Sequence, residues 1–135
     1  MSRIFIFIWC IFFLSCNDFK SVKIEKLSGY WEIDFITQQK EKFNQNNNAP
    51  LYDYYQLNFP KGILKKVKPL LNGRYVSSRD AIYFEIEKIN KKYYIRFKSR
   101  WDEWSRKISH LDSQKLILEN GKREYHYKRP LTIIQ

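Results

Sequence analysis

The stretch IYFEIEKINKKYYIRFK, residues 82–98, decides the fold class of this chain. Apolar and polar side chains alternate on both sides of Asn90 and Lys91, the period-2 pattern of a half-buried strand. A two-residue turn at Asn90-Lys91 places apolar residues opposite apolar ones on one face and a glutamate opposite an arginine on the other. The expected pairs are Phe84 with Phe97, Glu85 with Arg96, Ile86 with Ile95, and Ile89 with Lys92. A slip of one residue would exchange the two faces, so the pattern predicts an antiparallel hairpin.

A second hairpin is expected near the C-terminus. Asn120-Gly121 is an Asn-Gly pair, which accepts the positive φ angles of a type I′ turn. With the turn centred there, the expected pairs are Leu116 with Tyr125, Lys115 with His126, and Glu119 with Lys122. Apolar and polar residues again sort onto separate faces.

The rest of the body supplies further strands. Residues 29–37 alternate, with Trp31, Ile33 and Phe35 expected on the inner face. Shorter strands are expected at 52–59, 62–68, 74–77 and 103–110. About eight or nine strands separated by turns predict an all-β fold, an antiparallel up-and-down β-barrel of about eight strands. Residues 38–50 are polar and Asn-rich, and we expect a long loop there, either a functional lid or a disordered insert.

The N-terminus has the parts of an export signal. Arg3 precedes an apolar run over residues 4–14 that is too short to cross a bilayer, for which about 20 residues are needed. Leu14-Ser15-Cys16 resembles the end of a bacterial lipobox, which implies cleavage before Cys16 and lipidation of that cysteine. Cys10 would be lost with the signal, so the mature chain would have no internal disulfide. The alternative is an ordinary secreted protein in which Cys16 is a free or paired thiol.

A further resemblance concerns the body of the chain. Gly29-Tyr30-Trp31 at the start of a strand resembles the lipocalins and the lipocalin-like lipoproteins of bacteria, in which a Gly-x-Trp strand opens the barrel. The resemblance implies that residues 38–50 occupy the place of the lid loop. It also implies that a basic residue at the end of the last strand, Arg129 or Lys128, packs over Trp31 by a cation–π contact.

These features divide the chain into four parts. We expect a lipoprotein signal peptide at 1–15, a lipidated N-terminus and tether at 16–28, a lipocalin-like barrel at 29–130 and a tail at 131–135. The formal net charge of +11 favours anionic partners, and lysines of the tether would lie close to anionic lipid head groups. An exported protein rarely meets nucleic acid, so nucleic acid is not an expected partner.

Several aromatic residues are candidates for ligand contact. Tyr52 and Tyr54 follow the expected lid, and Trp101 and Trp104 flank two acids at Asp102 and Glu103. Tyrosine and tryptophan present an apolar body with a polar tip, which suits a ligand rim or a core. Trp31 completes the set of expected ligand-contacting residues. The alternatives for 101–104 are a strand connection in which the acids pair with Arg100 and Arg106, and an acid–base pair of carboxyl groups between apolar walls.

No catalytic or metal-binding motif accompanies these residues. The chain has two histidines, His110 and His126, and neither lies in a zinc-ligand spacing. Nucleophile-elbow, metalloprotease and phosphate-loop motifs are absent from the sequence. We therefore expect no enzyme activity, no metal and no cofactor, with both histidines in structural roles.

Two functions remain open at this point. The first is a lipid-anchored envelope protein that binds a small apolar or amphipathic ligand. The second is a filled barrel that acts as an envelope protein-interaction or inhibitor module, which the bulky inward residues favour. Either protein would sit in the cell envelope, with the outer membrane favoured and the periplasmic or surface face undetermined.

Overall fold

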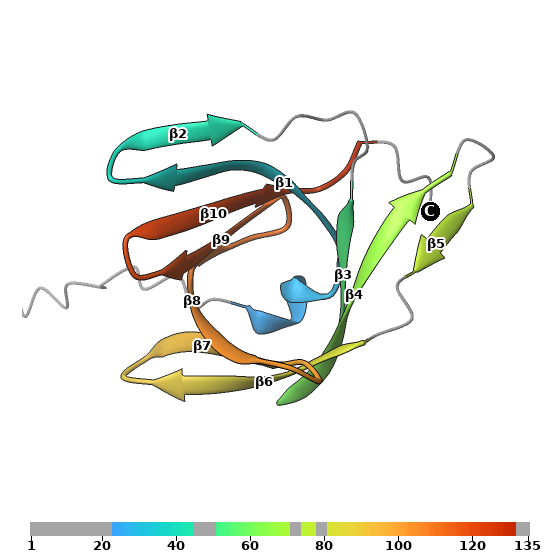
Figure 1. Ribbon diagram of the computed structural model, residues 1–135. Helices are drawn as coiled ribbons and strands as arrows, with labels where there is room; N and C mark the ends of the chain where they lie inside the picture. The colour runs from blue at the N-terminus through green and yellow to red at the C-terminus, as the bar shows by residue number, and fades with distance from the viewer. Residues whose placement is uncertain (1–22, 45–50, 71–73, 78–80, 132–135) are drawn as a thin grey trace, which may run out of the picture.

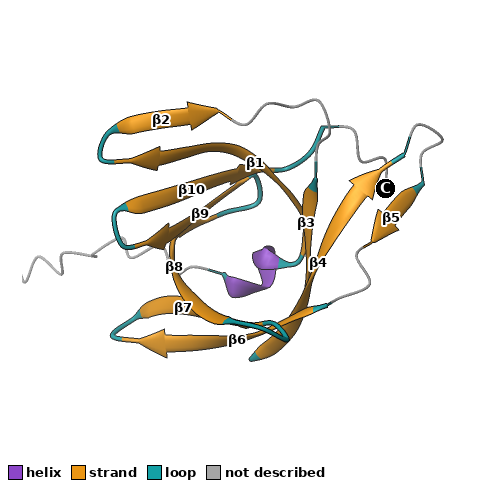
Figure 2. Ribbon diagram, viewed as in Figure 1, coloured by secondary structure: helices purple, strands orange, loops and turns teal. Residues whose placement is uncertain are grey.

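The computed structural model describes residues 23–44, 51–70, 74–77 and 81–131. Figures 1 and 2 show the strands curving around one short helix. The elements are the 3₁₀ helix η1 (Ile24–Leu27) and the strands β1 (Gly29–Gln38), β2 (Glu41–Asn44), β3 (Tyr52–Asn58), β4 (Lys61–Pro69), β5 (Tyr75–Ser77), β6 (Ile82–Ile89), β7 (Lys92–Lys98), β8 (Glu103–Leu111), β9 (Lys115–Asn120) and β10 (Arg123–Lys128). The predicted signal peptide, Cys16 and residues 45–50 of the expected lid lie outside the described residues.

The strands close into a barrel. Neighbours follow the order β10-β9-β8-β7-β6-β4-β3-β1, and β10 pairs with β1 to complete the ring of eight antiparallel strands. The strands β2 and β5 extend the sheet beside β1 and β4. The predicted fold class, an antiparallel up-and-down barrel of about eight strands, is confirmed. Closure leaves no free edge in the ring itself.

The two predicted hairpins have different outcomes. Residues 82–98 form β6 and β7 with every predicted pair present, and Asn90 and Lys91 have φ angles of 50° and 65°, as a type I′ turn requires. The register predicted for the last hairpin is wrong by two residues, since Leu116 pairs with Tyr127 rather than Tyr125.

The turn of this last hairpin explains the error. It consists of Gly121 and Lys122, and only Gly121 has a positive φ, at 60°. A single positive φ at the first turn position is typical of type II′, which needs Gly121 but not the preceding asparagine. A shift of two residues keeps each side chain on its face, so the predicted faces hold although the partners differ.

The long loop expected at 38–50 is also corrected. Gln39 and Lys40 form a two-residue turn with φ angles of 49° and 68°, and β2 returns along β1 as far as Asn44. The sequence signal was weak because the four residues of β2 are all exposed, so the strand has no buried face that an apolar–polar alternation would mark.

A β-bulge in β1 corrects the predicted inner face. The register with β10 shifts between Ile33 and Phe35, which leaves Asp34 as the extra residue. Beyond the bulge the alternation is reversed. Phe35 therefore stacks on His126 with ring centroids 4.2 Å apart and has Lys42 over its ring, while Ile36 takes the inward position.

Residues 24–27 belong to the barrel rather than to a solvated tether. They form η1, and its two apolar residues, Ile24 and Leu27, are buried in the hydrophobic core. Figure 1 shows this helix inside the ring of strands. The only helix among the described residues has four residues, so none of those residues lies in a helix able to span a bilayer.

Candidate functional site

The barrel has two unlike ends, because the connections between antiparallel strands alternate between them. The closed end carries η1 and the turns at 59–60, 90–91 and 112–114, while the open end carries the turns at 39–40, 99–102 and 121–122. At the closed end the Trp31 indole donates a 2.8 Å hydrogen bond to the Leu27 carbonyl. Trp31 is fully buried, so η1 and β1 close this end of the barrel to solvent.

Arg129 caps the closed end. Its guanidinium carbon lies 3.6 Å from the Trp31 ring centre, which is the contact that the lipocalin resemblance implies. The guanidinium donates to the carbonyls of Tyr30 at 2.9 Å and Lys26 at 2.7 Å, and its Nε donates to the Ser113 carbonyl at 3.2 Å. Burial lowers the pKa of Arg129, yet a guanidinium stays charged. Arg129 therefore ties η1, β1 and the β8–β9 turn together.

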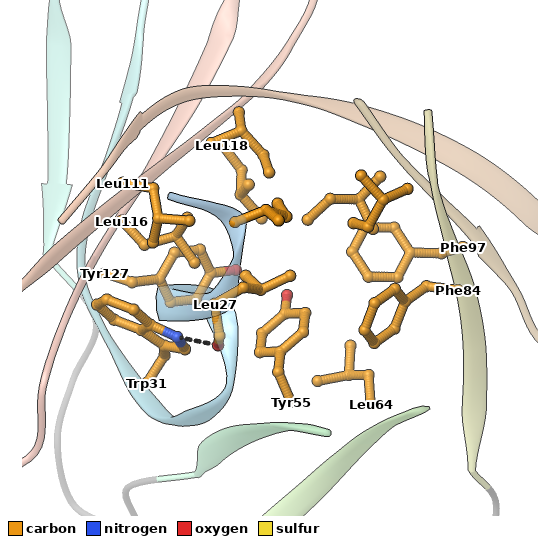
Figure 3. Packing of buried hydrophobic residues seen from close by; sticks show 14 residues of the cluster. Leu27, Trp31, Tyr55, Leu64, Phe84, Phe97, Leu111, Leu116, Leu118 and Tyr127 are labelled. Carbon is orange, nitrogen blue, oxygen red and sulfur yellow. Dashed lines mark hydrogen bonds between the residues drawn. The ribbon is translucent and has the colours of Figure 1, made fainter. Parts of the chain in front are cut away.

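Side chains fill the middle of the barrel. Figure 3 shows Tyr55, Phe84 and Phe97 pointing toward one another from different strands. Tyr55 and Phe84 pack edge to face with centroids 5.6 Å apart, and Phe84 and Phe97 lie 6.2 Å apart. Both separations suit favourable aromatic packing. Ring packing and the aliphatic side chains of Leu64 and Leu118 fill the space in which an eight-stranded barrel could otherwise hold a ligand.

A hollow of about 250 Å³ lies above this packed region, toward the open end. Its lining combines apolar and charged residues, namely Ile33, Ile36, Leu51, Asp53, Lys66, Arg106, Tyr125 and Tyr127. Asp53 is buried and accepts a hydrogen bond from the Lys66 ammonium at 2.5 Å. The guanidinium of Arg106 lies over the Tyr125 ring, with its carbon 3.9 Å from the ring centre.

The charged residues that line this hollow have a net positive charge. Lys66 and Arg106 contribute two cations and Asp53 one anion, and Lys66 is already engaged with Asp53. The Nε atom of Arg106 is buried and has no hydrogen-bond partner. A buried donor without a partner costs free energy that an acceptor would recover. The hollow is therefore suited to an acidic group.

Two buried tyrosines border the charged residues. Burial raises the pKa of Tyr127, with a further rise from Asp53 that Arg106 opposes. Burial likewise raises the pKa of Tyr55 well above its ordinary value, with Asp53 again adding to the rise. Both phenols therefore remain protonated at neutral pH and offer neutral O–H groups beside the charged ones.

The structure does not bring the predicted ligand-contacting residues together. Trp31 is in the closed-end core. Tyr52 is buried but lies outside the core cluster, and it pairs with Val67 on β4. Tyr54 packs against Tyr30 with ring centroids 4.7 Å apart. None of these three lines the open-end hollow.

The two remaining tryptophans also lie apart from the hollow. Trp104 stacks on Phe97 at 5.4 Å, whereas Trp101 is 85% exposed on the β7–β8 turn. The acids beside them do not form the expected pairs. The Asp102 carboxylate accepts from the Glu103 amide, and Glu103 lies 3.8 Å from Arg96. Arg100 and Arg106 instead lie over aromatic rings.

One feature of the sequence could have predicted the hollow, namely charged residues at inward positions of strands, but the predicted ligand-binding residues came from the aromatic clusters. Arg106 alternates with Trp104 and Ile108 on the inward face of β8, and Asp53 alternates with Tyr55 on β3. A charged residue at an inward strand position is the pattern that marks a polar site in a barrel interior. No three His, Cys, Asp or Glu side chains in the described part of the chain lie close enough together to hold a metal ion.

Comparison with known proteins supports the fold. No protein-family model matches the sequence, and no curated protein matches it. Among solved structures, apocrustacyanin C2 matches with a TM-score of 0.51 at 10% identity, over 84% of this chain and 66% of that one. Lobster apocrustacyanin A1 matches with a TM-score of 0.50 at 9% identity, over the same shares. This chain thus spans about two thirds of their length.

A third neighbour is a lipocalin-like protein from Bacteroides uniformis. Its TM-score is 0.48 at 11% identity, over 77% of this chain and 98% of that chain. At identities this low, structural likeness establishes the architecture and not the activity. The chain is a closed, eight-stranded antiparallel barrel, and the apocrustacyanins are structural neighbours that share this architecture.

Proposed function

We propose that the protein binds a small amphipathic ligand through an acidic group held at Arg106. The observation that carries this proposal is the buried Arg106 Nε, which has no partner and borders a hollow with an excess of positive charge. A carboxylate or phosphate accepts from a guanidinium in a geometry that neutral groups do not match. The role is binding, with no catalytic step.

The size of the hollow limits the ligand. About 250 Å³ lies below the roughly 300–1,000 Å³ of ordinary ligand pockets, and aromatic rings fill the barrel beneath it. An acidic head group fits this space together with a short apolar portion against Ile33 and Ile36. A longer chain would leave the barrel past Leu51, which is 53% exposed. The ligand class is therefore a compact amphipathic acid.

The proposal includes a lipid anchor on Cys16 and a place in the cell envelope. Support comes from the sequence alone, from the short apolar run ended by Ser15-Cys16. Two or more acyl chains hold a protein stably at a membrane. Replacement Cys16→Ser should abolish labelling by radioactive palmitate and release the barrel into the soluble fraction. Unchanged membrane retention and labelling would remove the anchor from the proposal.

Native mass spectrometry of the full chain tests the ligand. Protein extracted from its membrane in mild detergent should carry an added mass that dissociates as an organic acid. Arg106→Met should lower affinity for that acid about ten- to hundredfold, from the roughly 1.5–3 kcal/mol of a charged hydrogen bond. Arg96→Met is the matched control, because Arg96 pairs with Glu87 outside the hollow.

The ligand proposal also has a result that would contradict it. An unliganded mass that persists after exposure to envelope lipid extract would contradict the ligand proposal. It would favour the alternative of a filled barrel that docks other envelope proteins, for which the packed aromatic interior is the supporting observation.

A further inference from the structure

Besides Phe59 and Ile89 at the closed end, large apolar side chains are exposed around the open end. They come from separate elements, and they are Phe43 in β2, Leu51 before β3, Leu70 after β4, Val76 in β5, Tyr83 in β6 and Trp101 in the β7–β8 turn. We call this set the open rim. Trp101 at 85% and Tyr83 at 62% are its most exposed aromatic members. Large exposed apolar side chains of this kind mark an interaction site, and Tyr83 and Trp101 line one common hollow.

Hydrogen bonds hold Trp101 in its exposed position. The Ser99 amide donates to the Asp102 carbonyl at 2.8 Å, and the Ser99 hydroxyl accepts from the Trp101 and Asp102 amides at 3.3 and 3.0 Å. The Arg100 guanidinium lies over the Trp101 ring, with its carbon 5.0 Å from the ring centre. The turn is thus well ordered while it presents the largest apolar side chain of the rim to solvent.

A second hollow of about 460 Å³ lies beside this turn. Ile82, Tyr83 and Trp101 give it an apolar wall, and Lys98 and Arg100 add positive charge. The hollow does not share its lining with the Arg106 site. Apolar surface next to cations suits an acyl chain whose head group is anionic.

We propose that the open rim docks on the surface of an anionic lipid bilayer. Tryptophan and tyrosine favour the interfacial zone of a membrane, and each nearby lysine or arginine adds about 1 kcal/mol of attraction. The exposed residues lie on separate turns and strand ends around a ring. A fluid lipid surface can meet all of them at once, whereas a protein partner would need a matching contour. The formal net charge of +11 adds long-range attraction of the same sign.

Acidic residues near the turn are engaged by the barrel. Asp102 accepts from the Glu103 amide at 2.8 Å, and Glu103 lies near Arg96 on the adjacent strand. The cations Lys40, Lys42, Lys68 and Lys98 flank the rim on β1–β2, β4 and β7. This inference goes beyond the Arg106 ligand site and does not require that site to be occupied.

The test measures the fluorescence of Trp101 rather than binding of the whole protein to vesicles. The apolar N-terminal run of the full chain would bind vesicles in every sample, so total binding would not report on the open rim. Full-length protein is mixed with vesicles of about one third phosphatidylglycerol and two thirds phosphatidylcholine, whose acyl chains carry bromine as a quencher. The emission of Trp101 is the difference between the parent chain and Trp101→Phe. We expect bromine to quench most of this emission and acrylamide quenching to fall several-fold.

Matched variants separate docking from anchoring. Lys98→Gln with Arg100→Gln should restore Trp101 emission on these vesicles, as should high salt or vesicles of phosphatidylcholine alone. Lys92→Gln with Lys115→Gln removes the same charge at the closed end and should leave the quenching unchanged. An unchanged thermal midpoint in both variants confirms that the barrel is intact. The proposal is overturned if Trp101 stays fully accessible to acrylamide on anionic vesicles, or if the two double variants behave alike.

Discussion

Trp31 and Trp101 lie at opposite ends of the same barrel, and the chain uses them in opposite ways. Trp31 is fully buried, hydrogen-bonded to Leu27 and covered by Arg129, whereas Trp101 is 85% exposed on an ordered turn. The closed end satisfies its polar groups and excludes water. The open end leaves the buried Arg106 Nε without a partner and exposes Trp101 beside two cationic side chains. Stability is therefore concentrated at the closed end and binding capacity at the open end.

Replacement of each tryptophan by alanine should show the largest difference between the two ends. Trp31→Ala deletes a fully buried ring and should lower the free energy of unfolding by about 3–5 kcal/mol. Trp101→Ala should change it by less than about 0.5 kcal/mol, as an exposed substitution does. Urea unfolding followed by circular dichroism measures both. Equal losses would contradict the division between the ends.

The two arginines give a second comparison. Arg129→Met removes hydrogen bonds to several carbonyls and the contact with Trp31, and should cost about 2 kcal/mol of stability. Arg106→Met removes a buried Nε donor without a partner together with the contact over the Tyr125 ring, two opposing effects, and should change stability by less than about 1 kcal/mol. Chemical unfolding of both variants without ligand provides the measurement. A greater loss at Arg106 would mean that this residue supports the fold rather than a ligand.

Two glycines provide a smaller contrast. A Cβ on Gly62 would lie 2.2 Å from Phe84 Cζ and 2.6 Å from the Gln56 carbonyl oxygen, so Gly62→Ala should cost about 1–3 kcal/mol through overpacking. A Cβ on Gly121 meets nothing within 4 Å, and its φ of 60° is the only obstacle. Gly121→Ala should therefore cost only about 1 kcal/mol, and Gly121→Asn less, since asparagine tolerates positive φ. Thermal unfolding distinguishes the two cases.

The smallest expected effect depends on pH. The hydrogen bond from His110, with the Gln114 and Lys115 amides, lowers the pKa of Asp112 from 3.8 to about 2 in the closed-end β8–β9 turn. Since the folded pKa is the lower one, this stabilisation is complete above pH 3.8 and is lost as the pH falls toward 2. Asp112 is largely exposed, so Asp112→Asn should cost less than about 1 kcal/mol at neutral pH. The difference from the parent should shrink as the pH falls through about 2. A difference of unchanged size below that pH would mean that packing, and not the charge of Asp112, is responsible.

The sequence predicted the barrel and its strands better than it predicted the hollow at Arg106. Residues 82–98 alternate on both sides of Asn90-Lys91, and the turn placed there gave the correct register. The last hairpin had two registers with the same faces, and the alternation pattern could not separate them. The bulge at Asp34 leaves no mark in the alternation of β1, and it moved Phe35 outward. Asp53, Lys66 and Arg106 lie on three different strands and come together only because the barrel closes. A local sequence pattern therefore could not predict that they line one hollow.

A single nuclear magnetic resonance titration tests the central claim, that the open end binds an amphipathic acid while the closed end serves the fold. The Arg106 Nε–H and the Trp31 indole Nε1–H are followed as nitrogen-proton signals from the two ends, and hexanoate, a compact amphipathic acid, serves as the probe. We predict that hexanoate shifts the Arg106 signal in a saturable manner and leaves the Trp31 signal in place. An Arg106 signal that does not move, or a Trp31 signal that moves with it, would contradict the claim.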